Sequence, residues 1–219
     1  METWHEAGYV DALKRTHLVI LVDARGHGAS DKPHATSAYA KERQAADVVA
    51  VLDELQVRRA DYWGYSMGGR IGFALAQHAP GRFRCFVLGG AAGDGRSRIG
   101  DGFRRAMKEG GVAAIPGLWG AELPDTLRTR LLDNDVEALE ACRVDSLGFA
   151  DVLPTMTMPC LLYAGSEDPV YPVVEATVAE MPNAEFFSLP GLGHADGLFR
   201  SDLVLPRVTD FLRSVAELE

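Results

Sequence analysis

The chain has little of what marks secreted, metal-binding or membrane proteins. Its 219 residues include three cysteines, Cys85, Cys142 and Cys160, which cannot pair completely and lack the spacing of metal ligands. Cys85 and Cys160 lie in apolar, strand-like runs, where buried free thiols are expected. No apolar run approaches the roughly 20 residues of a membrane span, and the first residues lack the basic and apolar regions of a signal peptide. We therefore expect free thiols, no membrane span and a cytoplasmic location.

Positive charge is also scarce. The chain has 22 Lys and Arg against 31 Asp and Glu, which gives a net charge of −9. This balance argues against nucleic acid or an anionic membrane as the main partner. At 47% hydrophobic residues, the chain is long and apolar enough to bury a full core. The composition agrees with a soluble globular enzyme.

The most informative motif is the run Gly-Tyr-Ser-Met-Gly-Gly over residues 64–69, where glycine flanks Ser66 two positions away on each side. The apolar run 60–63 before it indicates a strand, and residues 70–76 after it indicate a helix. A sharp strand-to-helix turn needs small flanking residues and exposes the serine hydroxyl near a helix N-terminus. The backbone N–H of Met67 is then a candidate donor to an oxyanion.

An acidic residue and a histidine follow the serine in the chain. Asp168 comes after an apolar strand over 161–165, and His194 comes after a strand over 185–189. Both therefore lie past strand ends, at the edge of a parallel sheet where Ser66 also lies. A serine hydroxyl is a weak nucleophile, so it needs an imidazole to accept its proton and a carboxylate to orient that imidazole. Ser66, His194 and Asp168 are the candidate catalytic residues.

Other acidic residues are alternatives to Asp168 as the group that orients the imidazole. Asp94 also follows a strand, and Glu167 is adjacent to Asp168. Asp196 is too close to His194 in sequence to orient the ring easily, so we expect it to cap a helix.

Together with the run Asp-x-Arg-Gly-His-Gly-x-Ser over residues 23–30, these motifs resemble the α/β-hydrolase superfamily. We expect Asp23, Arg25 and His27 to hold that turn. The resemblance implies a cofactor-independent hydrolase of small esters, lactones or related acyl compounds, acting through a Ser-His-Asp triad and an acyl-enzyme, with no metal. The serine motif is similar to those of esterases, enol-lactonases, C–C bond hydrolases and menaquinone-pathway lyases, and does not choose among them.

The predicted fold class is α/β, a mostly parallel sheet flanked by helices. Residues 1–92 and 155–219 would form the core, and the strand-free stretch 93–154 resembles the superfamily's helical cap. Tyr65, Trp119 and Phe149 are candidate pocket residues. The expected elements are helices over 4–13, about 38–55 and from 67 to before Pro80, and strands over 18–22, 60–63, 83–89, 161–165 and 185–189.

The sequence also departs from the family pattern. Members usually begin with strands and a His-Gly loop that supplies a second oxyanion donor, and this chain starts at the helix after them. A central strand between 18–22 and 60–63 also has no counterpart. Because buried unpaired backbone groups are costly, we expect these two strands to pair directly or with a second chain, as in a homo-oligomer formed through an exposed strand edge. The missing loop leaves an alternative function, a weakly active or non-catalytic ligand-binding relative.

Overall fold

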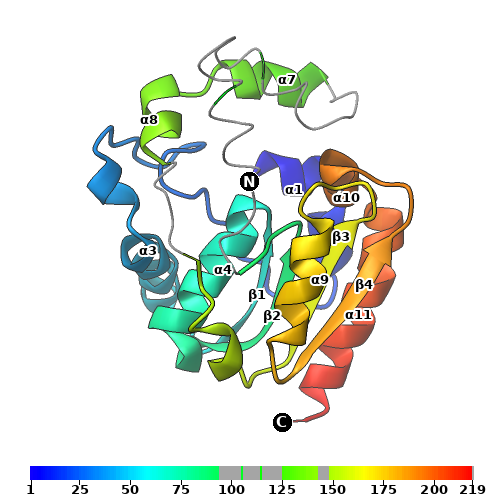
Figure 1. Cartoon of the computed structure of the whole chain (residues 1–219). Coiled ribbons are helices and arrows are strands. Elements are labelled where there is room, and N and C mark those ends of the chain that lie inside the picture. Colours follow the sequence, from blue (N-terminus) through cyan, green and yellow to red (C-terminus); the bar gives the residue numbers. More distant parts are fainter. Residues whose placement is uncertain (94–104, 106–113, 115–124, 143–147, 219) are drawn as a thin grey trace.

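The structure is a computed structural model that describes residues 1–93, 105, 114, 125–142 and 148–218. Its centre is a four-stranded sheet in the order β1-β2-β3-β4, with every neighbouring pair parallel (Figure 1). Parallel neighbours place the carboxyl ends of all four strands at one edge. The strands are β1 (Ala60–Tyr65), β2 (Phe83–Gly89), β3 (Cys160–Gly165) and β4 (Ala184–Leu189).

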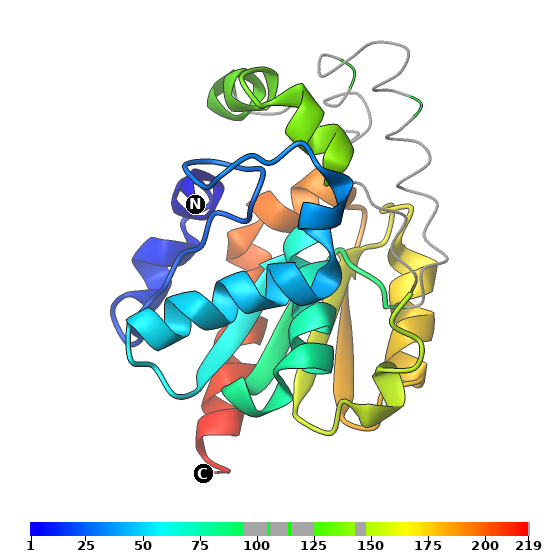
Figure 2. The same ribbon diagram turned by 90° about the vertical axis from the view of Figure 1, so that its left-hand side faces the viewer.

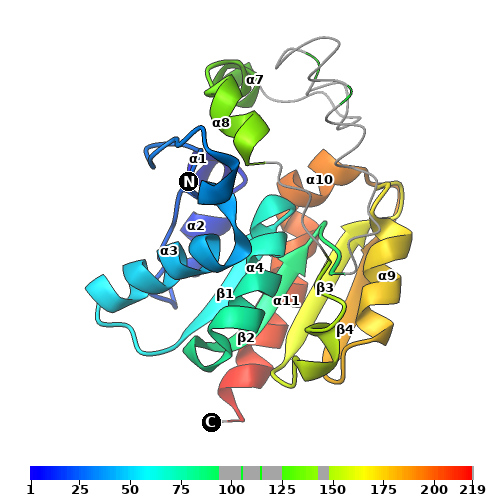
Figure 3. The same cartoon turned by 60° about the vertical axis from the view of Figure 1, so that its left-hand side comes forward.

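Helices cover both faces of this sheet (Figures 1 and 3). The helices α4 and α9 pack on one face, with α3 outside α4, whereas α11 packs on the other. The α-helices are α1 (Glu2–Glu6), α2 (Tyr9–Leu13), α3 (Lys41–Glu54), α4 (Met67–His78), α7 (Asp125–Leu132), α8 (Val136–Ala141), α9 (Tyr171–Ala179), α10 (His194–Phe199) and α11 (Ser201–Ala216), and the 3-10 turns are η1 (Thr36–Tyr39), η2 (Pro80–Arg82) and η4 (Leu153–Thr155).

The alternation of side chains along β2 explains the two layers of helices. Phe86 and Leu88 point into the cluster beneath α3, α4 and α9, whereas Cys85 and Val87 point into the cluster beneath α2 and α11. Because successive side chains of a strand face opposite sides, and all four are 0% exposed, both faces of β2 must be covered. This continuous apolar run is typical of the centre of a parallel sheet.

The predicted strands over 60–63, 83–89, 161–165 and 185–189 are confirmed, each to within a residue or two. The predicted helix over 4–13 is interrupted, because Gly8 adopts a left-handed φ of 82° and separates α1 from α2. Cys85, Cys142 and Cys160 are not joined in disulfides, and Cys85 and Cys160 are buried as expected. None of the helices in the described ranges has the length and apolar character needed to cross a membrane.

The predicted strand over 18–22 is wrong, and so is its direct pairing with β1. Residues 18–24 have no regular structure, and in the described sheet β1 pairs with β2 alone. Ile20 and Ala24 pack against the core, but Leu18 is 82% exposed. Local β-propensity does not make a strand without a neighbour to accept its backbone hydrogen bonds. Pairing with a second chain stays a prediction.

The helices α7 and α8 belong to the predicted cap over 93–154, and they lie beyond the carboxyl edge of the sheet (Figures 1 and 2). Cys142, at the end of α8, brings its Sγ to 3.7 Å from the Sδ of Met67 at the start of α4. The end of α8 therefore lies against the turn that carries Ser66.

Candidate active site

Ser66 occupies the turn between β1 and α4 in a strained conformation. Its φ is 52° and its ψ is −109°, a region that non-glycine residues avoid, at a cost of about 1–3 kcal/mol. The Ser66 N–H donates to the Gly89 carbonyl, 2.8 Å away at the end of β2. At Gly64, an added Cβ would overlap the backbone of Gly68. The glycine spacing thus permits the close approach of strand and helix that exposes the hydroxyl.

His194 begins α10, directly after the loop that follows β4. The buried hydroxyl of Tyr65 donates to the His194 carbonyl at 2.6 Å, and the two rings lie 5.4 Å apart. Burial, followed by neighbouring charges, raises the pKa of Tyr65 well above its usual value, so this hydroxyl keeps its proton and remains a donor. Tyr65 therefore packs beside the histidine and fixes its backbone.

Asp168 is 2% exposed and lies past the end of β3. Its Oδ2 is 2.6 Å from the Nδ1 of His194, and its Oδ1 accepts from the Val170 N–H at 3.0 Å. On the other side of the ring, the Nε2 of His194 lies 2.9 Å from the Oγ of Ser66. Glu167, the adjacent acid, is exposed. The structure thus places Ser66, His194 and Asp168 in one hydrogen-bonded row.

This row has the geometry for proton transfer. With its Nδ1 proton directed to Asp168, His194 presents an unprotonated Nε2 to the Ser66 hydroxyl. The Met67 N–H, the first of α4, donates to no other backbone group in the described part of the chain. A helix N-terminus carries a positive partial charge. An oxyanion formed on a carbonyl attacked by Ser66 would meet that donor.

Other acidic candidates have structural contacts. Oδ2 of Asp196 accepts from the Gly193 N–H at 3.1 Å, so Asp196 caps α10 as expected. Asp23 accepts from the Ala29 N–H at 3.0 Å, within its own turn. Asp94 lies outside the described residues.

The turn over 23–30 is fastened to α3. Arg25 contacts Asp47 through two hydrogen bonds of 2.6 Å, and also donates to the Ala38 carbonyl. The Nδ1 of His27 lies 3.2 Å from the Arg25 carbonyl. These contacts fit the structural role expected for Arg25 and His27.

The structure describes two of the three candidate pocket residues. Phe149 is 3% exposed and stacks on Phe73 with ring centroids 5.6 Å apart, and its role in a pocket stays a prediction. Tyr65 packs under His194, as described above. Trp119 lies outside the described residues.

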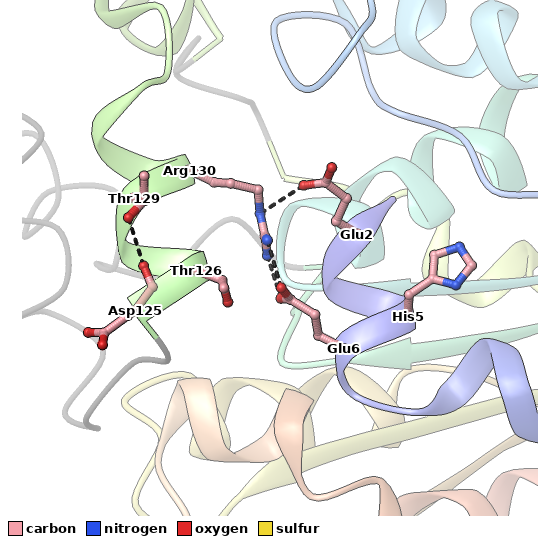
Figure 4. A pocket seen from close by; sticks show the side chains of 7 residues that line it. All are labelled: Glu2, His5, Glu6, Asp125, Thr126, Thr129 and Arg130. Atoms are coloured by element: carbon pink, nitrogen blue, oxygen red, sulfur yellow. Dashed lines mark hydrogen bonds and ion pairs between the residues drawn. The ribbon is translucent and has the colours of Figure 1, made fainter.

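A surface hollow of about 680 Å³ lies between α1 and α7 (Figure 4). Arg130 of α7 bridges it, with hydrogen bonds of 2.8 Å and 2.5 Å to the two carboxylate oxygens of Glu6 and an ion pair of 3.2 Å to Glu2. The hollow includes none of the triad candidates. Its charged groups fasten α7 to the N-terminal helix, and we do not assign it as a substrate site.

Arg70 was not among the predicted site residues. It lies on the first turn of α4, and its backbone N–H donates to the Ser66 carbonyl at 3.1 Å. The signal in the sequence was a basic residue only four positions after Ser66.

Gly165 gives a test of how the histidine loop is held. An added Cβ there would overlap the carbonyl of Leu192, in the loop before His194. Because backbone cannot yield as a flexible side chain does, we expect Gly165→Ala to destabilise the fold by about 1–3 kcal/mol. Thermal unfolding should show a fall in Tm of roughly 2–4 °C per kcal/mol for a chain of this size.

The matched control is Gly81→Ala, because nothing lies within 4 Å of an added Cβ at Gly81. Its stability should stay within about 0.5 kcal/mol of the wild type. Equal melting temperatures for the two variants would show that the loop moves freely away from β3.

Comparison with known proteins gives the family. A model described as "alpha/beta hydrolase fold" matches residues 1–109. The 3-oxoadipate enol-lactonase 2 of Acinetobacter baylyi is 33% identical over 175 residues, which cover 73% of this chain and 64% of the relative. The matched part thus spans less than two thirds of that relative's length.

Solved structures show the same fold. A hydrolase from Pseudomonas aeruginosa PA01 is 28% identical with a TM-score of 0.79, covering 96% of this chain and 84% of that one. The enol-lactonase from Burkholderia xenovorans LB400 is 24% identical with a TM-score of 0.82, and the match covers 97% of this chain and 86% of that one. The chain belongs to the α/β-hydrolase superfamily.

Proposed function

We propose that this chain is a cofactor-independent serine hydrolase that acts on small esters, lactones or related acyl compounds. The observation that carries the proposal is the row of hydrogen bonds from Asp168 through His194 to Ser66, with distances of 2.6 Å and 2.9 Å. The strained φ of Ser66 is independent support, because such strain persists where the surrounding structure imposes it and is concentrated at functional sites.

In the proposed reaction, the Ser66 Oγ attacks the acyl carbonyl while His194 Nε2 takes the hydroxyl proton. Asp168 stabilises the imidazolium that forms, and the Met67 N–H donates to the oxyanion. The imidazolium then gives its proton to the leaving oxygen, and an acyl-enzyme on Ser66 remains. Water, deprotonated by His194, hydrolyses that ester and restores the free serine.

The substrate class also rests on the relatives. The matched proteins include two enol-lactonases of Acinetobacter baylyi and a solved enol-lactonase of the same fold. An enol-lactone is an internal ester, so the acyl chemistry proposed for Ser66 would open it.

A serine-directed fluorophosphonate probe tests the nucleophile. The wild-type protein should be labelled at Ser66, because His194 activates this hydroxyl for attack on phosphorus. Intact-protein mass spectrometry followed by peptide mapping measures the site and extent of labelling. The variant Ser66→Ala should take up no probe.

The matched control is Ser214→Ala, which removes an exposed α11 hydroxyl that donates to the Phe211 carbonyl at 2.8 Å. This variant should be labelled as fast as the wild type. Labelling that persists in Ser66→Ala would remove Ser66 from the mechanism. A folded wild type that resists labelling would favour the non-catalytic ligand-binding relative.

A further inference from the structure

Arg70 lies on the first turns of α4, one helical turn beyond the proposed nucleophile. Its backbone N–H donates to the Ser66 carbonyl at 3.1 Å. Ser66 precedes the first residue of α4, and side chains of a helix lean toward its N-terminus. The Arg70 side chain therefore extends along the face of α4 that leads back to the Ser66 turn.

Among the described residues, Arg70 differs from the other partly buried arginines in having no carboxylate partner. In the described ranges, the other partly buried arginines each contact a carboxylate. These pairs are Arg25 with Asp47, Arg82 with Asp53, Arg84 with Asp61, and Arg130 with Glu6. For Arg70, the described residues supply no ion pair and no side-chain hydrogen bond. A guanidinium partly withdrawn from water without a counter-charge is costly, and burial lowers its pKa.

A second cation lies near this arginine. Lys41, the first residue of α3, has its Nζ 3.2 Å from the Gly148 carbonyl and 3.9 Å from the centre of the Phe149 ring. Burial and then the positive charge of Arg70 lower the pKa of Lys41. Lys41 and Arg70 therefore lie close enough for their positive charges to act on each other, in a chain with a net charge of −9.

We propose that Arg70, with Lys41 beside it, binds a carboxylate of the substrate, so that the preferred substrate is an acyl compound that carries a free carboxylate. This inference rests on the proposed hydrolase function. An arginine fork matches the two oxygens of a carboxylate, and such charge-assisted pairs are stronger where water is partly excluded. The bound carboxylate would supply the counter-charge that the described chain does not.

The test compares two esters of the same length, 4-nitrophenyl hexanoate and the mono-4-nitrophenyl ester of adipic acid. The wild type should have the higher kcat/KM for the adipate ester. In Arg70→Gln the ratio of the two kcat/KM values should fall ~10–100-fold, since a hydrogen-bonded charge is lost. Arg70→Lys, which keeps the charge but not the fork, should give an intermediate ratio.

Arg43→Gln is the control, because it removes the same charge from an exposed position on α3. Its ratio should match that of the wild type within about twofold, as expected for a screened surface charge. The proposal is overturned if the wild type does not prefer the adipate ester. It is also overturned if Arg70→Gln and Arg43→Gln give the same ratio.

A binding measurement tests the carboxylate site independently of the proposed hydrolase activity. Calorimetry on Ser66→Ala should show adipate binding that weakens ~10–100-fold when Arg70→Gln is added, with inorganic phosphate as a weaker competitor. If the wild type turns over neither ester but adipate binding depends on Arg70, the hydrolase proposal fails and the carboxylate site stands. The carboxylate site would be refuted if Arg70→Gln left adipate affinity unchanged. It would also be refuted if phosphate bound as tightly as adipate.

Discussion

Ser66→Ala and His194→Ala should each lower ester turnover by about 10⁶-fold, and the double variant should lose no more than either single one. The reason is that the two residues act as one unit. Without the imidazole the hydroxyl keeps its proton, and without the hydroxyl the imidazole has nothing to activate. The 2.9 Å contact between Ser66 Oγ and His194 Nε2 is the structural basis of this coupling.

The measurement is kcat for one activated ester across the wild type, the two single variants and the double variant. His78→Ala is the matched control, since His78 is an exposed histidine at the end of α4, and its kcat should equal that of the wild type. Losses that multiply in the double variant would mean that Ser66 and His194 act independently. A triad would then be excluded.

The site candidates could be predicted from sequence because a parallel sheet brings distant strand ends together. Ser66, Asp168 and His194 each follow an apolar strand, and the structure places all three at the carboxyl edge within hydrogen-bond distance. The buried strands were equally readable, because residues 85–88 of β2 form an unbroken apolar run. The order of these residues along the chain and the pattern of apolar strands were therefore enough to predict that they lie together.

What could not be predicted depends on pairing and on long-range contacts. The run over 18–22 is wholly apolar, but a strand also needs a neighbour, and β1 pairs with β2 alone in the described sheet. The sequence also did not show that the Tyr65 hydroxyl donates to the carbonyl of His194, which is 129 residues away. Arg70 stands out because the described residues supply no carboxylate to pair with it, and a sequence does not show which side chains pair.

Replacing Asp168 with Asn should lower ester turnover by about 10⁴-fold, as the equivalent change does in a serine protease. The amide would still fill the space beside His194. It would, however, present a donor to Nδ1 or accept without charge, so the ring would lose its preferred tautomer and the imidazolium its stabilising carboxylate. Because Oδ1 of Asp168 also accepts from the Val170 N–H, thermal unfolding must show that the variant remains folded.

Two carboxylates serve as controls that decide between the candidate acids. Glu167→Gln alters the adjacent but exposed acid, and Asp94→Asn alters the acid that follows β2, so both should keep kcat within about tenfold of the wild type if only Asp168 orients the imidazole. The predicted losses of kcat also differ in size among the three triad residues. We expect Asp168→Asn to lower kcat less than Ser66→Ala or His194→Ala does. A misoriented imidazole still accepts some protons, whereas an absent nucleophile forms no acyl-enzyme. A greater loss from Asp94→Asn than from Asp168→Asn would transfer the orienting role to Asp94, and the 2.6 Å contact between Asp168 and His194 would then be structural.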